Sequence, residues 1–308
     1  MTTSRRRAVV RKSRQVSLKD LSEVDQRRIA LANEAKASKR WALARRRWSA
    51  LAARLPHAWF WHEVAICERE LGRTAEAVVA ARRAARLSPR SEATQQFLGY
   101  TLLVLGRLRE AEAALRLAAR LRPDAVTYVF LFLALSRMGR LPQARRALLS
   151  ALRVDPDHEE AHYNLGAIAR RCGRTAEATR HLQRAIEIDP QYALALAELG
   201  RLLARQAPEE SVGYLRRALS LEPNDVISLL YLANSEWRTG ELAAAERSCE
   251  KALRLTPRNP VVLWAFGEFL SSTDRNRGRG GRMIRRSLSI DPLDAGARRA
   301  LRKHLERS

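Results

Sequence analysis

Several residue types that mark particular protein classes are scarce in this 308-residue chain. The three cysteines, Cys67, Cys172 and Cys249, form an odd number without close pairs. This count argues against a disulfide framework or a zinc ribbon, and it fits a reducing compartment. No run of 18 apolar residues occurs, so the sequence predicts no transmembrane helix. Val and Ile are scarce, so little of the chain favours β-strands.

The common catalytic motifs are also missing. The chain has no G-x-x-x-x-G-K-[ST], no G-x-G-x-x-G and no G-x-S-x-G motif. Residues 158–162 read HEEAH and match the H-E-x-x-H signature of zinc proteases, but no third ligand follows at a suitable spacing. Asp157 and Glu160 form a helix-capping pattern that accounts for the local polar residues. We therefore predict an accidental match: no enzyme, no metal site and no cofactor.

The residues that are abundant favour helix and positive charge. Leu, Ala, Arg and Glu dominate, and all four are good helix formers. The net charge is +24, and much of it lies at the ends, because residues 1–57 hold 16 basic and 4 acidic residues and residues 260–308 hold 11 and 5. The basic start lacks the apolar core of a secretory signal. We predict a cytoplasmic protein, and the arginine- and serine-rich start leaves a transit peptide open as the alternative.

A regular repeat organises the chain. Prolines recur at intervals of 33 to 35 residues, at positions 56, 89, 123, 156, 190, 223, 257 and 292. Five of them have a glycine seventeen residues earlier, and these glycines are Gly72, Gly106, Gly139, Gly173 and Gly240. Lys39, Gln206 and Arg275 occupy the same place before the other three prolines. Each repeat also carries two small residues seven apart, such as Ala77 and Ala84.

The repeat predicts stacked helix–turn–helix units. Glycine ends a first helix because it tolerates the left-handed conformation, and proline ends the second because it restricts the residue before it. The small residues allow the two helices to approach closely, and stacking of neighbouring units buries the apolar face that one unit leaves exposed.

The period and the stretch Ala161-His-Tyr-Asn-Leu-Gly166 resemble the tetratricopeptide repeat family. The resemblance implies an all-α, right-handed α-solenoid of stacked helix–turn–helix units. We expect a basic N-terminal arm over residues 1–24, tandem repeats over 25–292 and a C-terminal capping helix over 293–308. The eight expected repeats start near residues 25, 58, 92, 125, 159, 192, 226 and 260.

The resemblance also implies where a partner would bind, because the first helices of such repeats line a concave groove. Positions 2, 5, 6, 9, 12 and 13 of each repeat are expected to face that groove. The expected groove residues are Phe97, Tyr100, Leu103 and Val104; Val126, Val129, Phe130 and Leu133; Tyr163, Asn164, Arg170 and Arg171; Glu198, Arg201 and Arg205; and Tyr231, Asn234, Trp237 and Arg238.

These residues make one half of the expected groove apolar and the other half mixed. An exposed apolar patch usually marks an interaction site, and arginine forks bind carboxylates. We therefore predict a non-catalytic adaptor, co-chaperone or assembly scaffold that binds a peptide or helix with apolar and acidic segments. The alternative is that the chain's own N-terminal region or a second copy covers the apolar half, so a homo-oligomer stays open.

The basic ends suggest a second partner class. Residues 1–19 hold seven basic residues and no acidic one, and residues 275–286, RNRGRGGRMIRR, are similar to RGG segments that bind single-stranded nucleic acid. The alternative function is therefore a nucleic-acid-binding solenoid; acidic protein partners, anionic membranes or a merely solvated tail remain open. The candidate phosphate-binding residues are Arg5, Arg6, Arg7, Arg11, Arg14, Arg277, Arg279, Arg282 and Arg285.

Overall fold

The computed structural model describes residues 21–273 and 276–306, and within these ranges the chain forms seventeen α-helices and no β-strand. The described residues fall into two compact bodies, one ending at Pro156 and the other beginning at Asp157. The N-terminal body contains α1 (Glu23–Ala37), α2 (Trp41–Arg54), α3 (Ala58–Glu70), α4 (Thr74–Leu87), α5 (Glu92–Val104), α6 (Leu108–Leu121), α7 (Ala125–Arg137) and α8 (Leu141–Val154). The C-terminal body contains α9 (Glu159–Arg171), α10 (Thr175–Ile188), α11 (Ala193–Leu203), α12 (Pro208–Leu221), α13 (Val226–Arg238), α14 (Leu242–Leu255), α15 (Pro260–Ser272), α16 (Arg277–Ile290) and α17 (Ala295–Glu306).

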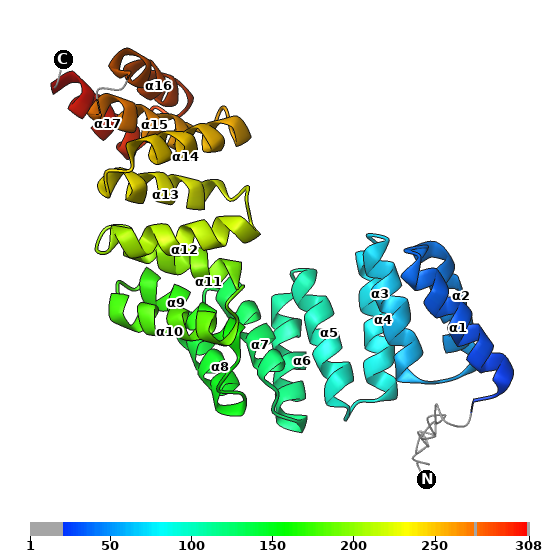
Figure 1. The fold of residues 1–308 in the computed structure, drawn as a ribbon. Coiled ribbons are helices and arrows are strands. Elements are labelled where there is room, and N and C mark those ends of the chain that lie inside the picture. Colours follow the sequence, from blue (N-terminus) through cyan, green and yellow to red (C-terminus); the bar gives the residue numbers. More distant parts are fainter. Residues whose placement is uncertain (1–20, 274–275, 307–308) are drawn as a thin grey trace, which may run out of the picture. The chain divides into compact units, whose positions relative to one another are not determined.

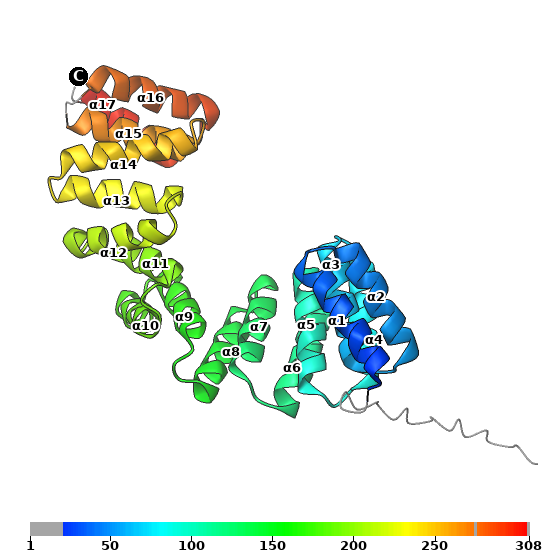
Figure 2. The ribbon, with the colours of Figure 1, turned by 45° about the vertical axis from the view of Figure 1, so that its right-hand side comes forward.

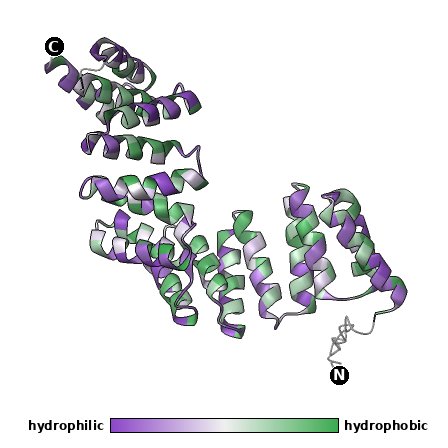
Figure 3. Ribbon diagram, viewed as in Figure 1, coloured by the Kyte–Doolittle hydropathy of each residue, from purple (hydrophilic) through white to green (hydrophobic). Residues whose placement is uncertain are grey.

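Within each body the helices pack in antiparallel pairs that follow the chain (Figures 1 and 2). Each first helix packs against the second helix of its own pair, as α5 does with α6. Within the bodies, α3, α5, α9, α11 and α13 also contact the first helix of the next pair. Hydrophobic and hydrophilic residues alternate along the helices (Figure 3), as expected where one face of each helix is buried. The prediction of an all-α solenoid of repeated helix pairs is confirmed.

The turn between the two helices of a pair depends on a left-handed residue. The five glycines of the repeat have φ angles between 71° and 84°. Lys39, which occupies the same place in the first pair, also has a positive φ of 54°. At Gln206 the pattern differs, because α11 ends early at Leu203 and no positive φ occurs in that turn. In the first pair, Lys39 therefore adopts the backbone conformation that is usual for glycine, although its Cβ atom disfavours that conformation.

The prolines and the small residues act as the repeat predicts. Every second helix from α2 to α16 ends two residues before its proline, because proline disfavours helical conformation in the residue that precedes it. The paired alanines are fully buried; Ala77, Ala84, Ala178 and Ala185 are examples with no exposed surface. These sites form the close contacts of the core.

A second set of glycines lies inside the first helices, at the closest approach to the second helices. A Cβ atom at Gly99 would lie 2.5 Å from Leu115 Cγ, and one at Gly166 would lie 2.7 Å from Leu182 Cγ. Distances this short are not tolerated without movement of the neighbouring leucine. These glycines fix how closely the two helices of a pair can pack.

Candidate functional site

The first helices of each body present a recurring stripe of exposed and half-buried residues. Four residues spaced i, i+4, i+7 and i+11 lie on one face of a helix because 3.6 residues complete one turn. On α5 the stripe is Ala93, Phe97, Tyr100 and Val104, and on α7 it is Val126, Phe130, Leu133 and Arg137. Leu103 and Val129 were also expected on this face, but only 2% and 1% of their surfaces are exposed, so they belong to the core. We call each set of stripes the first-helix face of its body.

The first-helix face of the N-terminal body is mostly apolar. The Tyr100 and Phe130 rings lie 4.9 Å apart, which brings α5 and α7 together through aromatic contact. Phe97 packs against the ring of His62 on α3. Val104 and Val126 remain 46% and 42% exposed, so the aromatic layer has aliphatic side chains in solvent at its edges.

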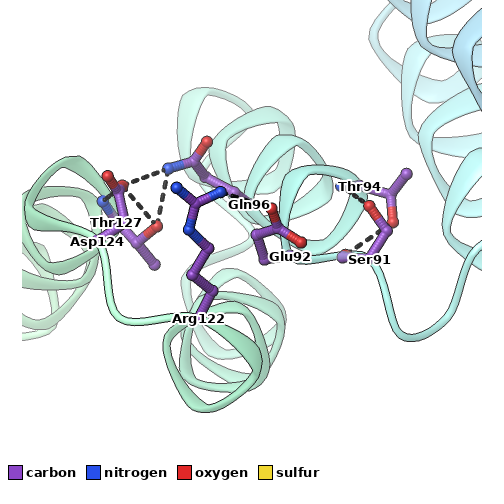
Figure 4. Close-up of polar contacts among 7 residues, drawn as sticks. All are labelled: Ser91, Glu92, Thr94, Gln96, Arg122, Asp124 and Thr127. Atoms are coloured by element: carbon purple, nitrogen blue, oxygen red, sulfur yellow. Dashed lines mark hydrogen bonds and ion pairs between the residues drawn. The ribbon is translucent and has the colours of Figure 1, made fainter.

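Hydrogen bonds fix the junction of α5 and α7 beside this apolar face (Figure 4). The Gln96 side-chain nitrogen donates to Asp124 Oδ2 at 2.9 Å and lies 2.7 Å from Thr127 Oγ1. Asp124 also caps α7 by accepting from the Thr127 backbone N–H. Arg122 pairs with Glu92 at 3.3 Å. These polar contacts hold α5 and α7 together beside the apolar stripe.

In the C-terminal body, α9 contributes mainly internal contacts. Tyr163 is half-buried, and its ring meets the Tyr192 ring edge-on at 5.4 Å. Burial raises the pKa of the Tyr163 phenol above its usual value, so it stays neutral. The Asn164 side-chain nitrogen donates to the Glu160 carbonyl within the same helix. Tyr163 and Asn164 were expected to face the groove, but both side chains already make contacts within the C-terminal body.

Arg170 and Arg201 were expected to receive carboxylates of a partner, but they surround a buried carboxylate of the chain. Glu198 on α11 is 5% exposed. The Arg170 Nε group donates to one of its oxygens, and Arg201 Nη2 lies 2.8 Å from the other. A buried carboxylate requires such partners, because desolvation penalises an unpaired charge. These two arginines therefore connect α9 with α11, and they carry one positive charge beyond the carboxylate they share.

The stripe on α13 is the most accessible part of this face. Ile227, Tyr231, Asn234 and Arg238 are all exposed. Leu194 on α11 and Val261 on α15 occupy the same place as Ile227 at the start of their helices, and both are exposed. Trp237 is only half-buried but packs inward, with its ring 5.9 Å from the Phe269 ring. The exposed residues thus form an aliphatic row across the starts of three neighbouring first helices.

A row of arginines lies at the opposite ends of these helices. Arg171 ends α9, Arg205 follows α11 and Arg238 ends α13, and all three are exposed. Arg238 Nη2 donates to the Arg205 carbonyl oxygen at 3.2 Å. Cations are favoured at helix C-termini because the backbone carbonyls there carry partial negative charge. The face therefore has an aliphatic edge and a cationic edge.

The structure gives the RGG-like segment another role. Residues 277–290 form α16, and Gly280 and Gly281 lie where helices meet: a Cβ atom would be 2.4 Å from Ser271 Oγ at the first and 2.4 Å from His304 Nε2 at the second. Arg279 lies over the Phe266 ring, and Arg277 donates to the His304 carbonyl oxygen. These glycines thus allow close packing.

Of the other candidate phosphate-binding residues, two lie on α16 and five lie near the N-terminus. Arg282 and Arg285 are exposed on α16. The N-terminal candidates, which are Arg5, Arg6, Arg7, Arg11 and Arg14, lie outside the described residues. Nucleic-acid contact by either end stays a prediction.

The HEEAH segment spans the start of α9. His158 is the N-cap residue and makes no side-chain capping bond, so the predicted cap by Asp157 is wrong; Asp157 instead pairs with Arg184. His162 Nδ1 lies 3.0 Å from His181 Nδ1 on α10. Within residues 21–273 and 276–306, no group of three or more His, Cys, Asp or Glu side chains is placed to hold a metal ion.

The thiols differ in environment. Cys67 and Cys249 are buried, and Cys172 is exposed at the end of α9. Burial raises the pKa of Cys67 to about 11 and that of Cys249 to about 12. Such thiols stay protonated and unreactive at neutral pH. No helix in the described part of the chain is both long and apolar enough to span a membrane.

Comparison with known families agrees with this architecture. Two family models, both described as Tetratricopeptide repeat, match residues 131–193 and 196–260 in one case and residues 93–125 in the other. Together they span about half of the chain. The chain belongs to the tetratricopeptide repeat family. The paired helices, the left-handed turn glycines and the buried alanines described above are thus features of a tetratricopeptide repeat protein.

Solved structures share the fold of this tetratricopeptide repeat protein at low sequence identity. A chain from the APC/C hetero-tetramer Cut9-Hcn1 is 16% identical, with 94% of this chain and 57% of that one covered and a TM-score of 0.62. YrrB, described as a TPR protein with an unusual peptide-binding site, is 21% identical, with 62% and 99% covered and a TM-score of 0.54.

Among curated proteins, the matching relatives share only a short segment. Protein adenylyltransferase Fic of Drosophila mojavensis is 35% identical over 89 residues, which are 29% of this chain and 18% of that protein. The same enzyme of Drosophila erecta is 35% identical over 74 residues, which are 24% and 15% of the two chains. The tetratricopeptide repeat chain thus spans less than a fifth of the length of either relative, and the likeness does not extend to a whole enzyme.

Proposed function

We propose that this protein is a non-catalytic interaction scaffold whose first-helix faces bind peptide or helical segments of partner proteins. The observation that carries the proposal is the exposure of apolar stripe residues on a fold that belongs to the tetratricopeptide repeat family. Apolar side chains grouped on one face usually mark a binding surface. The peptide-binding site named for YrrB supports the same use of the fold.

The two bodies offer different chemistry, so we propose different segments for each. The N-terminal face, with Tyr100, Phe130, Val104 and Val126, suits an apolar segment. The C-terminal face, with its aliphatic row and its arginine row, suits a segment with apolar residues on one side and carboxylates on the other. The free thiols fit a reducing compartment, and we propose the cytoplasm as the place of action.

The test compares exposed residues on first helices with matched residues on second helices. The double variant Val104→Ser and Val126→Ser removes aliphatic contacts from the N-terminal face. The control, Val79→Ser and Leu149→Ser, changes side chains that are 50% and 37% exposed on α4 and α8. Because all four residues lie at the surface, both double variants should fold like the native protein.

Affinity capture from lysate, with nuclease treatment and quantitative identification of bound proteins, then reports the outcome. The proposal predicts that the first variant loses proteins that the control retains. Equal capture by both variants would show that the N-terminal face is not the binding surface. If the bound material disappears on nuclease treatment, a nucleic-acid partner replaces the protein partner.

A further inference from the structure

The outer surface of the first helix pair contains a cavity that the proposed function does not use. Its volume is about 400 Å³, and it lies between α1 and α2. It is lined by Arg28, Leu31, Arg47, Ala50, Leu51 and Arg54. Leu31 is 46% exposed, so this apolar side chain lies largely in solvent.

Comparison with the next repeat shows what this surface is built to contact. In the N-terminal body, α2 packs on α3, α4 on α5 and α6 on α7, so a second helix covers each later first helix. Val64 is the residue 33 positions after Leu31, and it is only 4% exposed because it shares a core cluster with Trp48 of α2. Among the described residues no second helix precedes α1. The cavity therefore lies where a helix packs in every following pair of this body.

The charge of the lining residues differs from that of their counterparts in the next repeat. The residues 33 positions after Arg28, Arg47 and Arg54 are Trp61, Ala80 and Leu87, whereas the counterpart of Ala50 is Arg83. The first pair thus has three guanidinium groups where the next has one, and we call these three arginines the rim; Leu31, Ala50 and Leu51 supply the apolar part of the lining. A rim that only kept the end of the solenoid soluble would not need charges of one sign.

The local carboxylate does not balance these charges. Asp25 is almost fully buried and pairs with Arg28 at 3.3 Å and with Arg54 at 3.4 Å. Arg47 donates to the Leu31 carbonyl oxygen. One carboxylate faces three guanidinium groups, so the rim remains cationic and available to further carboxylates.

We propose that this α1–α2 surface binds an acidic amphipathic helix of a partner protein, which packs where a preceding second helix would lie. An apolar residue of the partner enters between Leu31 and Ala50, and its carboxylates pair with Arg47 and Arg54. These two arginines are two turns apart on α2, about 10.5 Å along the helix axis. The matching helix therefore carries Asp or Glu residues seven positions apart, with Leu or Ile midway.

Charge repulsion disfavours the binding of another segment of this chain, or of a second copy, at the α1–α2 surface. The C-terminal helix α17 carries Arg298, Arg299, Arg302 and Lys303, and residues 1–19 carry seven basic residues and no acidic one. The same surface of a second copy would bring three more arginines against the first three. A partner with carboxylates satisfies the rim, whereas these basic segments would repel it.

The experiment uses the full chain and a fluorescein-labelled synthetic helix that carries glutamates seven positions apart with leucine midway. Binding is measured by fluorescence anisotropy at increasing NaCl. We expect Arg47→Glu and Leu31→Ser each to weaken binding roughly tenfold or more, and salt to weaken it as well. The control Arg86→Glu reverses an exposed arginine on α4, and Val104→Ser changes the first-helix face, so both should bind the peptide like the native protein.

Two results would overturn this proposal without touching the proposed function. One is an affinity for the peptide that does not differ among the native protein, Arg47→Glu and Leu31→Ser. The same conclusion follows if the native protein binds equally well to a peptide in which lysines replace the glutamates. The other comes from a photo-cross-linking amino acid at position 31 in the absence of peptide. Cross-links to residues 1–20 or to a second copy would show that the chain itself covers the surface.

Discussion

Glycines at two kinds of position set the geometry of the helix pairs. Turn glycines such as Gly72 adopt the left-handed conformation that ends a first helix, and their regular spacing from the prolines made this role predictable. Gly280 and Gly281 instead lie where Ser271 and His304 approach from other helices. Because those two residues belong to other helices, the sequence around Gly280 carries no signal of this contact.

Gly166→Ala should destabilise the C-terminal body by about 1–3 kcal/mol, because the new methyl group would clash with Leu182. The matched control is Gly213→Ala, which lies inside α12 with no atom within 4 Å of the added Cβ. That control should stabilise by up to about 1 kcal/mol, because alanine favours helix more than glycine does. Urea unfolding followed by circular dichroism measures both, and a similar loss for both variants would contradict the packing role of Gly166.

Lys39→Gly should stabilise the first helix pair by about 1 kcal/mol, since it relieves a positive φ in a residue with a Cβ atom. The neighbouring Ser38→Gly is the control, because Ser38 has a φ of −79° and gains nothing from glycine. Hydrogen exchange of α1 and α2 amides reports the difference. Slower exchange in Lys39→Gly but not in Ser38→Gly is the expected result, and no difference between them would exclude strain at Lys39.

At the scale of helices, the sequence predicted which segments form helices but not what their side chains meet. Arg170 and Arg201 were assigned to ligand binding from their position in the repeat. In the structure both surround Glu198, whose burial follows from the packing of α9 against α11. A charge on a first helix therefore cannot be assigned to a partner until the carboxylates of the neighbouring helix are placed.

Docking of the C-terminal helix α17 should depend on pH. His304 is buried and 3.0 Å from Ser271 Oγ, and its pKa is lowered by burial and by Arg277 and Arg285. The unfolded helix binds a proton below the ordinary pKa of 6.5, whereas the docked helix resists it. Stability is therefore complete above about pH 6.5 and decreases as the pH falls below that value.

Hydrogen exchange of α17 amides at pH 7.5 and pH 5.5, corrected for the intrinsic exchange rates, measures this effect. We expect less protection at the lower pH in the native protein and a smaller pH difference in His304→Gln, which keeps a hydrogen-bonding side chain but does not titrate. An unchanged pH difference in the variant would assign the effect to other groups.

For the molecule as a whole, the repeat period was enough to predict the fold. Each helix pair contacts mainly its neighbours within a body, so a period of 33 to 35 residues is enough to predict stacked pairs. The exposed face was less predictable. Leu103 and Val129 were expected in the groove but are buried, whereas Ile227 and Leu194 were not singled out although they are exposed. The burial of a first-helix residue depends on contacts with other helices, which the repeat pattern does not specify.

We expect partners to bind the first-helix faces and not the outer faces of the second helices. The most direct measurement places a photo-cross-linking amino acid at position 126 or 231, on first helices, and at position 79 or 255, on second helices; the native side chains at all four positions are exposed. We expect protein cross-links from positions 126 and 231 that are absent from positions 79 and 255. Cross-links only from positions 79 and 255 would contradict it.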